Sequence, residues 1–133
     1  MAETQDRQLK YHFEWLLAGW AMVGVIVYFS LTPAPPLPTF DFADKLFHVA
    51  AYAGLMFWFC QLYSQARTRN LYALGFAALG TVLEVLQQMG GVRVLDPADM
   101  LANITGIGAT WLLWRYRPIY LLAWFEGVLH GKA

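Results

Sequence analysis

Four long apolar runs, joined by short polar segments, take up most of the 133 residues of this chain. They lie at about 13–31, 44–63, 70–88 and 98–115. A helix needs about 20 apolar residues to cross a bilayer, so four crossings use about 80 residues. The remainder suffices for tails and loops but is too short for an added soluble domain of ordinary size. The sequence therefore predicts an all-α membrane protein, a single domain over 1–133, built as a bundle of four transmembrane helices.

The composition supports this class and excludes others. Hydrophobic residues make up 59% of the chain and charged residues 14%, whereas soluble domains are about 45–50% apolar and about 25% charged. Disorder is excluded because it requires low hydrophobicity. The formal net charge is zero, so no basic excess exists to neutralise phosphates, and we expect no nucleic-acid partner. The single cysteine, Cys60, rules out an intrachain disulfide and is expected to be a small buried hydrophobe.

The segments between the runs carry stop and start signals for helices. The first run is longer than the apolar region of a signal peptide, about 7–15 residues, and no cleavage signal follows it. It ends at Pro33 and further prolines, which predict an uncleaved span followed by a rigid loop. Asp44 lies in the first turn of the second run, where a carboxylate suits the helix dipole. Asp96 before Pro97 predicts an N-cap for the fourth run.

Basic residues are distributed unevenly between the two sides of the predicted bundle. With four spans, the N-terminal tail, the second loop and the C-terminal tail share one side. That side holds Arg7, Lys10, Arg67, Arg69, Arg115, Arg117 and Lys132, and the other side holds Lys45 and Arg93. Because basic loops stay cytoplasmic, we expect both termini in the cytoplasm and a multi-pass location in a bacterial inner membrane. The tail at about 119–130 is too short to span, which predicts an interfacial helix; a partial fifth helix packed against the bundle is the alternative.

Polar side chains gather at the outward-facing ends of three predicted helices. Asp44, His48 and Tyr52 are spaced i, i+4, i+8 and so lie along one helix face. The other members are Lys45, Glu84 and Gln87 on the second and third helices, Asp99 and Asn103 on the fourth, and Arg93 in the third loop. We expect this set to form a polar pocket at the outer mouth of the bundle.

Glu84 is the most informative member of the set because apolar residues flank it on both sides. An ionisable group inside a span costs a few kcal/mol or more unless it faces protein or water. It must therefore be paired or keep its proton, and the candidates for pairing are His48 and Arg93. Simpler interpretations stay open for other members: helix-dipole charges for Asp44 and Asp99, and a snorkelling interface residue for Lys45.

Several of the polar and small residues have structural interpretations as well. Interhelical hydrogen bonding, rather than ligand binding, could explain Gln87 and Asn103. Ala102, Gly106 and Thr110 form a ladder of small residues, so Gly106 is expected to serve close helix contact. Among the polar residues of the predicted pocket, His48 is the one histidine, and with the scattered carboxylates it matches no strong metal motif. We therefore expect no metal and no cofactor.

The order of these motifs resembles the VanZ-like family of small membrane proteins. The resemblance covers about Ser30 to Trp114 and rests on Ser30-Leu-Thr32-Pro33, Asp44-Lys45-x-x-His48-x-x-x-Tyr52, Glu84-x-x-Gln87, and Arg93 with Asp99-x-x-x-Asn103-x-x-Gly106. It implies a multi-helix membrane protein. The founding member of the family is associated with low-level resistance to the glycopeptide teicoplanin. The resemblance therefore implies a class and a set of motif residues, and no reaction.

Four functions are compatible with this pattern. The leading hypothesis is a pocket that binds a lipid headgroup or a lipid-linked envelope intermediate, with Arg93 and Lys45 holding an anion. The second is an enzyme, a hydrolase or transferase on a membrane lipid, with His48 and Glu84 as general acid and base and Asp99 as a further candidate. The third is a purely structural network. The fourth is a small transporter, which would need polar residues along the whole path.

Overall fold

The computed structural model describes residues 9–33 and 42–131. In this part of the chain all regular structure is helical and no strand is present. The helices, in chain order, are α1 His12–Leu31, α2 Ala43–Leu62, α3 Ala66–Met89, α4 Pro97–Tyr116 and α5 Leu121–Leu129. The proline-rich segment with Pro35, Pro36 and Pro38, and the basic residues Arg7 and Lys132, lie outside the described residues.

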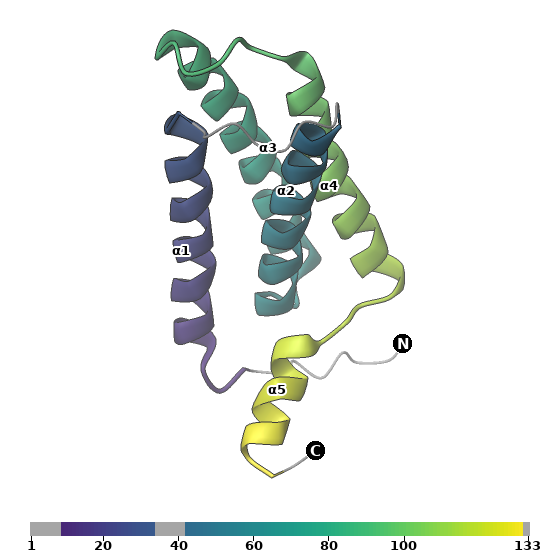
Figure 1. Ribbon diagram of the computed structural model, residues 1–133. Coiled ribbons are helices and arrows are strands. Elements are labelled where there is room, and N and C mark those ends of the chain that lie inside the picture. The colour runs from purple at the N-terminus through teal and green to yellow at the C-terminus, as the bar shows by residue number, and fades with distance from the viewer. Residues whose placement is uncertain (1–8, 34–41, 132–133) are drawn as a thin grey trace.

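The four long helices run side by side, and α5 lies beyond them at the end opposite the α3–α4 loop (Figure 1). Helix α2 is the central element: it packs most extensively against α4 and also contacts α1 and α3. Its Leu55, Met56 and Phe59 are at most 1% exposed. Cys60 is buried beside them, as the sequence predicts. The core thus forms around α2 and positions the first turns of α2 and α4 next to each other.

Most helix boundaries agree with the sequence, and the exception is the start of α3. Asp96 caps α4 as predicted, because its Oδ1 accepts the Ala98 N–H at 2.8 Å. The expected third helix begins at 70, whereas α3 begins at Ala66. The added turn contains Arg67 and Arg69, and the Arg69 guanidinium donates to the carbonyls of the residues that precede the helix. The expected bounds followed the apolar run, so they missed a first helical turn that is made mostly of polar residues.

Helix α5 is fastened to the start of α1. The Glu126 carboxylate accepts the backbone N–H of Lys10 at 2.7 Å and that of Tyr11 at 3.0 Å, and the Trp15 indole N–H at 2.7 Å. The two backbone N–H groups lie just before the first residue of α1, where the helix provides no acceptor for them. Glu126 is 7% exposed, whereas Trp124 is 60% exposed. The short C-terminal helix is therefore amphipathic, with one face docked and the other left open.

Two helices among the described residues are long and apolar enough to cross a membrane: α1, with a mean hydropathy of 1.6, and α3, with 1.2. Helices α2 and α4 are also 20 residues long. The first turns of α2 carry Asp44, Lys45 and His48, which lower its hydropathy.

Candidate functional site

Most of the predicted polar residues meet at the end of the bundle formed by the first turns of α2 and α4, the last turns of α3, and the loop that joins α3 to α4 (Figure 1). Gly91 allows the chain to leave α3, since its φ of 67° is a left-handed conformation that glycine adopts without strain. The loop then carries Arg93 back over α2. We call this set the charged cluster, and its members are Asp44, Lys45, His48, Glu84, Arg93, Asp96, Asp99 and Asn103.

Arg93 joins α2 to α4 at the open side of the charged cluster. Its Nη1 and Nη2 atoms lie 3.1 and 2.5 Å from Oδ1 and Oδ2 of Asp44. The same Nη2 lies 3.2 Å from Oδ2 of Asp99 on α4. Hydrogen bonding to Asp44 raises the pKa of the guanidinium. A two-pronged pairing of this kind fixes both position and orientation of the two side chains.

Lys45 makes a second bridge between the helices. Its Nζ lies 2.5 Å from Oδ2 of Asp96, 3.6 Å from Oδ2 of Asp44, and within hydrogen-bond distance of Oδ1 of Asp99. The Lys45 hydrogen bond and the Ala98 N–H lower the pKa of the Asp96 carboxyl. Asp96 therefore has two roles, capping α4 and binding Lys45. The cap was predicted from the sequence and the ion pair was not, although the i, i+3 spacing of Asp96 from Asp99 places both carboxylates on one face.

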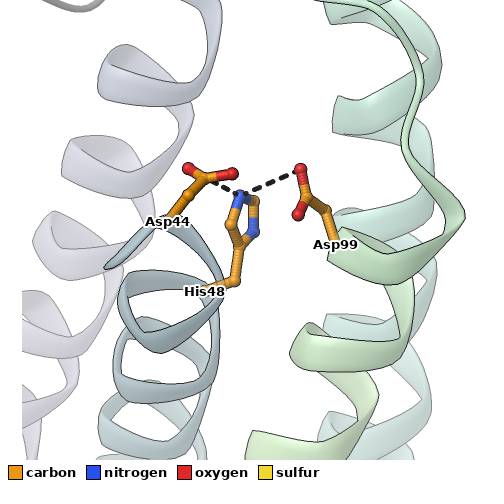
Figure 2. Close-up of side chains that lie close together, drawn as sticks. All are labelled: Asp44, His48 and Asp99. Carbon is orange, nitrogen blue, oxygen red and sulfur yellow. Dashed lines mark ion pairs between the residues drawn. The ribbon is translucent and has the colours of Figure 1, made fainter. Parts of the chain in front are cut away.

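His48 lies between the two aspartates that Arg93 contacts. Its Nε2 atom is 3.6 Å from Oδ2 of Asp99 and 3.9 Å from Oδ1 of Asp44, and Figure 2 shows both contacts reaching this one nitrogen. The other nitrogen, Nδ1, is 2.8 Å from the side-chain oxygen Oδ1 of Asn103. Because that oxygen can only accept, Nδ1 carries the hydrogen. Asn103 thus orients the ring so that Nε2 faces the carboxylates.

Glu84 lies on the inner side of the ring, at the base of the charged cluster. It is 2% exposed, and its Oε1 is 4.0 Å from Nδ1 of His48. Among the described residues no hydrogen bond to its carboxylate is formed. The pairing with His48 predicted from the sequence is present as a close approach, and the contact with Arg93 is not. A buried carboxylate with unused hydrogen-bonding capacity is uncommon in folded proteins.

Exposure decreases steadily from the rim of the charged cluster to its base. The exposed fractions of the side chains are 43% for Asp96, 37% for Asp44, 36% for Arg93 and 30% for Lys45. His48 follows with 14%, and Glu84 and Asp99 are at 3% and 1%. The cluster is therefore open at the end of the bundle and closed toward its middle, with two cations at the rim that share one buried carboxylate.

Two predicted members lie apart from the charged cluster. The side-chain Nε2 of Gln87 donates to the backbone carbonyl of Ser30 on α1 at 2.6 Å, and its Oε1 is buried without a partner among the described residues. Tyr52 is 3% exposed and packs against Gly80 of α3. Gln87 thus matches the alternative of interhelical hydrogen bonding. Tyr52 belongs to the core below the cluster.

The two residues expected to be structural also lie outside the charged cluster. Pro33 follows the end of α1 and is exposed. A Cβ at Gly106 would overlap the carbonyl oxygen of Val49 and lie 3.0 Å from the backbone nitrogen of Ala53. The absence of a side chain at Gly106 is thus what lets α4 approach the backbone of α2.

The donor atoms of Asp44, His48 and Asp99 lie within 4.8 Å of one another, so these residues have the types and spacing that could hold a metal ion (Figure 2). Both carboxylates are already paired with Arg93, and Asp99 also with Lys45. These cations supply the positive charge that a metal would otherwise supply. The geometry therefore favours an ion-pair network over a metal centre.

Comparisons of the chain with protein-family models, with curated proteins and with solved structures find no match.

Proposed function

We propose that the chain is a four-span inner-membrane protein of the VanZ-like class, with both termini cytoplasmic. Each of the four long helices has at least 20 residues, and 20 residues of helix extend about 30 Å, the thickness of the hydrocarbon layer. All four also carry large apolar side chains on their outer surfaces: Leu17, Leu46, Leu74 and Leu101 are 55%, 59%, 69% and 64% exposed. Lipid contact would cover these side chains, which supports four spans.

We infer that the charged cluster binds the anionic headgroup of a lipid or of a lipid-linked envelope intermediate at the outer face. The observation that carries this proposal is the pair of rim cations, Arg93 and Lys45, which are about one-third exposed and share the buried Asp99. A phosphate could replace the exposed Asp44 as the partner of Arg93, since guanidinium groups bind phosphate and carboxylate with the same two-pronged geometry. Asp99 would keep both cations in place.

Binding is tested with undecaprenyl phosphate as the probe and purified protein in detergent. Saturable binding is expected, and Arg93→Gln should weaken it about tenfold, the scale of a charge-assisted hydrogen bond. Arg67→Gln, an exposed arginine at the other end of the bundle, is the matched control and should change nothing. Equal weakening by both variants, or no saturable binding, would contradict a headgroup site at the charged cluster.

The membrane topology is tested separately with reporter fusions. Reporters at both termini and after Arg69 are expected to report a cytoplasmic position, because the basic residues collect on that side. An external signal at either terminus would rule out the four-span arrangement with this orientation.

A second candidate function is catalysis on the same class of lipid. It is favoured by the position of His48, whose Nδ1 lies 4.0 Å from the otherwise unbonded carboxylate of Glu84. A histidine with an adjacent carboxylate can move protons during hydrolysis or group transfer. Glu84→Gln should then abolish headgroup release while undecaprenyl phosphate still binds. Loss of membrane insertion by this variant or by His48→Ala would instead indicate a structural network.

A further inference from the structure

A second site of different character lies at the opposite end of the bundle. Its cavity has a volume of about 1010 Å³, which is the size of pockets that hold small ligands, about 300–1,000 Å³. The walls come from the end of α2 and its following loop, the start of α3, the end of α4, and the segment around α5. Under the proposed topology this is the cytoplasmic end.

The described residues that line this cavity carry positive charge only. Arg69 and Arg115 are among them together with His12, and none of these described residues is an aspartate or glutamate. The charged cluster at the other end holds four carboxylates against Lys45 and Arg93. No carboxylate of a described lining residue competes for Arg69 and Arg115, so the cavity favours an anion.

Arg115 has hydrogen-bonding capacity to spare. Its guanidinium carbon lies 5.8 Å from the ring centre of Trp111, a cation–π contact, and it forms no hydrogen bond or ion pair with other described residues. The Trp111 indole N–H donates to Oδ1 of Asn70 at 2.7 Å, which fixes the ring. A guanidinium carries five N–H donors. Arg115 is therefore held in position by a π-face while its donors remain available.

Arg69 faces the same cavity with part of its guanidinium in use. Its Nη1 donates to the backbone carbonyls of Tyr63 and Ser64. Its remaining N–H groups make no other hydrogen bond within the described part of the chain. A phosphate between Arg69 and Arg115 would receive charge-assisted hydrogen bonds from both, the strong class of such bonds.

The surroundings favour a lipid over a soluble anion. The lining combines the arginines with Leu62, Trp114 and other apolar groups. An amphipathic ligand can therefore place its headgroup against the arginines and its acyl chains against the apolar groups. Tyr116 and Trp124, near the same end, are 72% and 60% exposed, as in the aromatic belts at membrane interfaces. Basic pockets between helices on the cytoplasmic side are typical sites for anionic headgroups.

We propose that this cavity binds the phosphate headgroup of an anionic phospholipid from the cytoplasmic leaflet, with Arg115 and Arg69 as its ligands. The site is separate from the charged cluster and shares with the proposed function only the membrane location and orientation.

The test measures binding of short-chain phosphatidylglycerol to the purified protein by native mass spectrometry and calorimetry. Arg115→Gln is expected to weaken binding about tenfold. Arg117→Gln, exposed and two residues away but outside the cavity lining, is the matched control and should bind as the wild type does. Equal losses in both variants would show a general charge effect and would overturn the proposal, as would unchanged binding in Arg115→Gln.

Two ligand controls identify the source of the phosphate. Short-chain phosphatidylcholine, which is zwitterionic, should bind at least about fivefold more weakly; equal binding would contradict an anion site. Glycerol phosphate should compete weakly because it lacks the apolar chains, and competition as strong as that of the lipid would overturn the lipid assignment. Arg115→Gln should retain the Arg93-dependent binding of undecaprenyl phosphate, so failure here is distinguishable from failure at the charged cluster.

Discussion

Arg93 and Asp44 form a two-pronged ion pair across 49 residues of sequence, with N···O distances of 3.1 and 2.5 Å. The pair ties the loop before α4 to the first turn of α2. Because Nη2 of Arg93 also reaches Asp99 at 3.2 Å, one guanidinium bridges an exposed and a buried carboxylate. Arg93 therefore links the rim of the charged cluster to the buried Asp99.

The ion pair between Arg93 and Asp44 is predicted to make a modest contribution to the stability of the folded protein. In a double-mutant cycle of Arg93→Gln and Asp44→Asn, we expect an interaction free energy of about 1 kcal/mol, because both side chains are more than one-third exposed and such pairs are screened. Unfolding in mixed detergent micelles provides the four free energies. An interaction energy near zero would show that the ion pair adds nothing to stability.

Asp99 is predicted to contribute far more to the free energy of unfolding than Asp96. Asp99→Asn leaves Lys45 and Arg93 without their shared buried partner, so we expect a loss of about 3 kcal/mol in unfolding free energy. Asp96→Asn keeps the helix cap, since asparagine caps as well as aspartate, and removes only an exposed ion pair, so we expect a much smaller loss. Detergent unfolding of both variants checks this order, and equal losses would contradict it.

Gly106 and Gly108 lie on the same helix and are predicted to respond in opposite ways to alanine. At Gly106 the new methyl group would overlap the backbone of Val49, which cannot move aside, so we expect a loss of about 3 kcal/mol. At Gly108 nothing lies within 4 Å of the new methyl group. Gly108→Ala should therefore be neutral or stabilise α4 by up to about 1 kcal/mol. Thermal unfolding of the two variants in detergent separates these outcomes.

Helical spacing, together with the alternating direction of the four predicted helices, was sufficient to predict that the charged residues share one end of the bundle. Asp44 and His48, like Asp99 and Asn103, are four residues apart, which fixes their common face without any knowledge of the fold. The partner of each side chain was not predictable. Lys45 could have bound any nearby carboxylate, and its pairing with Asp99 depends on the close approach of α2 and α4 at Gly106.

Contacts between residues near the two ends of the sequence could not be predicted either, for a related reason. Glu126 and Lys10 are 116 residues apart, and no local pattern indicates that one will accept the backbone N–H of the other. The sequence left open whether the C-terminal tail lies on the membrane or packs against the bundle. Its docking through Glu126 was invisible because a single glutamate in an apolar tail has many possible partners.

The contact of Glu126 with α1 predicts acid sensitivity at this end of the molecule. Burial raises the pKa of Glu126, but the N–H groups of Tyr11, Trp15 and Lys10 outweigh it and hold the pKa below the ordinary glutamate value of 4.5. A carboxyl whose pKa is lower in the folded state stabilises that state above the ordinary value. The stabilisation disappears as the pH falls through the lowered pKa.

Glu126→Gln should therefore destabilise the protein by about 1–3 kcal/mol at pH 7, and the difference from the wild type should shrink as the pH is lowered below about 4.5. The readout is the thermal unfolding midpoint of both proteins between pH 7 and pH 3, because their difference cancels the titration of all other groups. Glu14→Gln, an exposed glutamate in the first turn of α1, should follow the wild type throughout. A gap between the wild type and Glu126→Gln that stays constant with pH would contradict the charged form of Glu126 as the group that fastens α5 to α1.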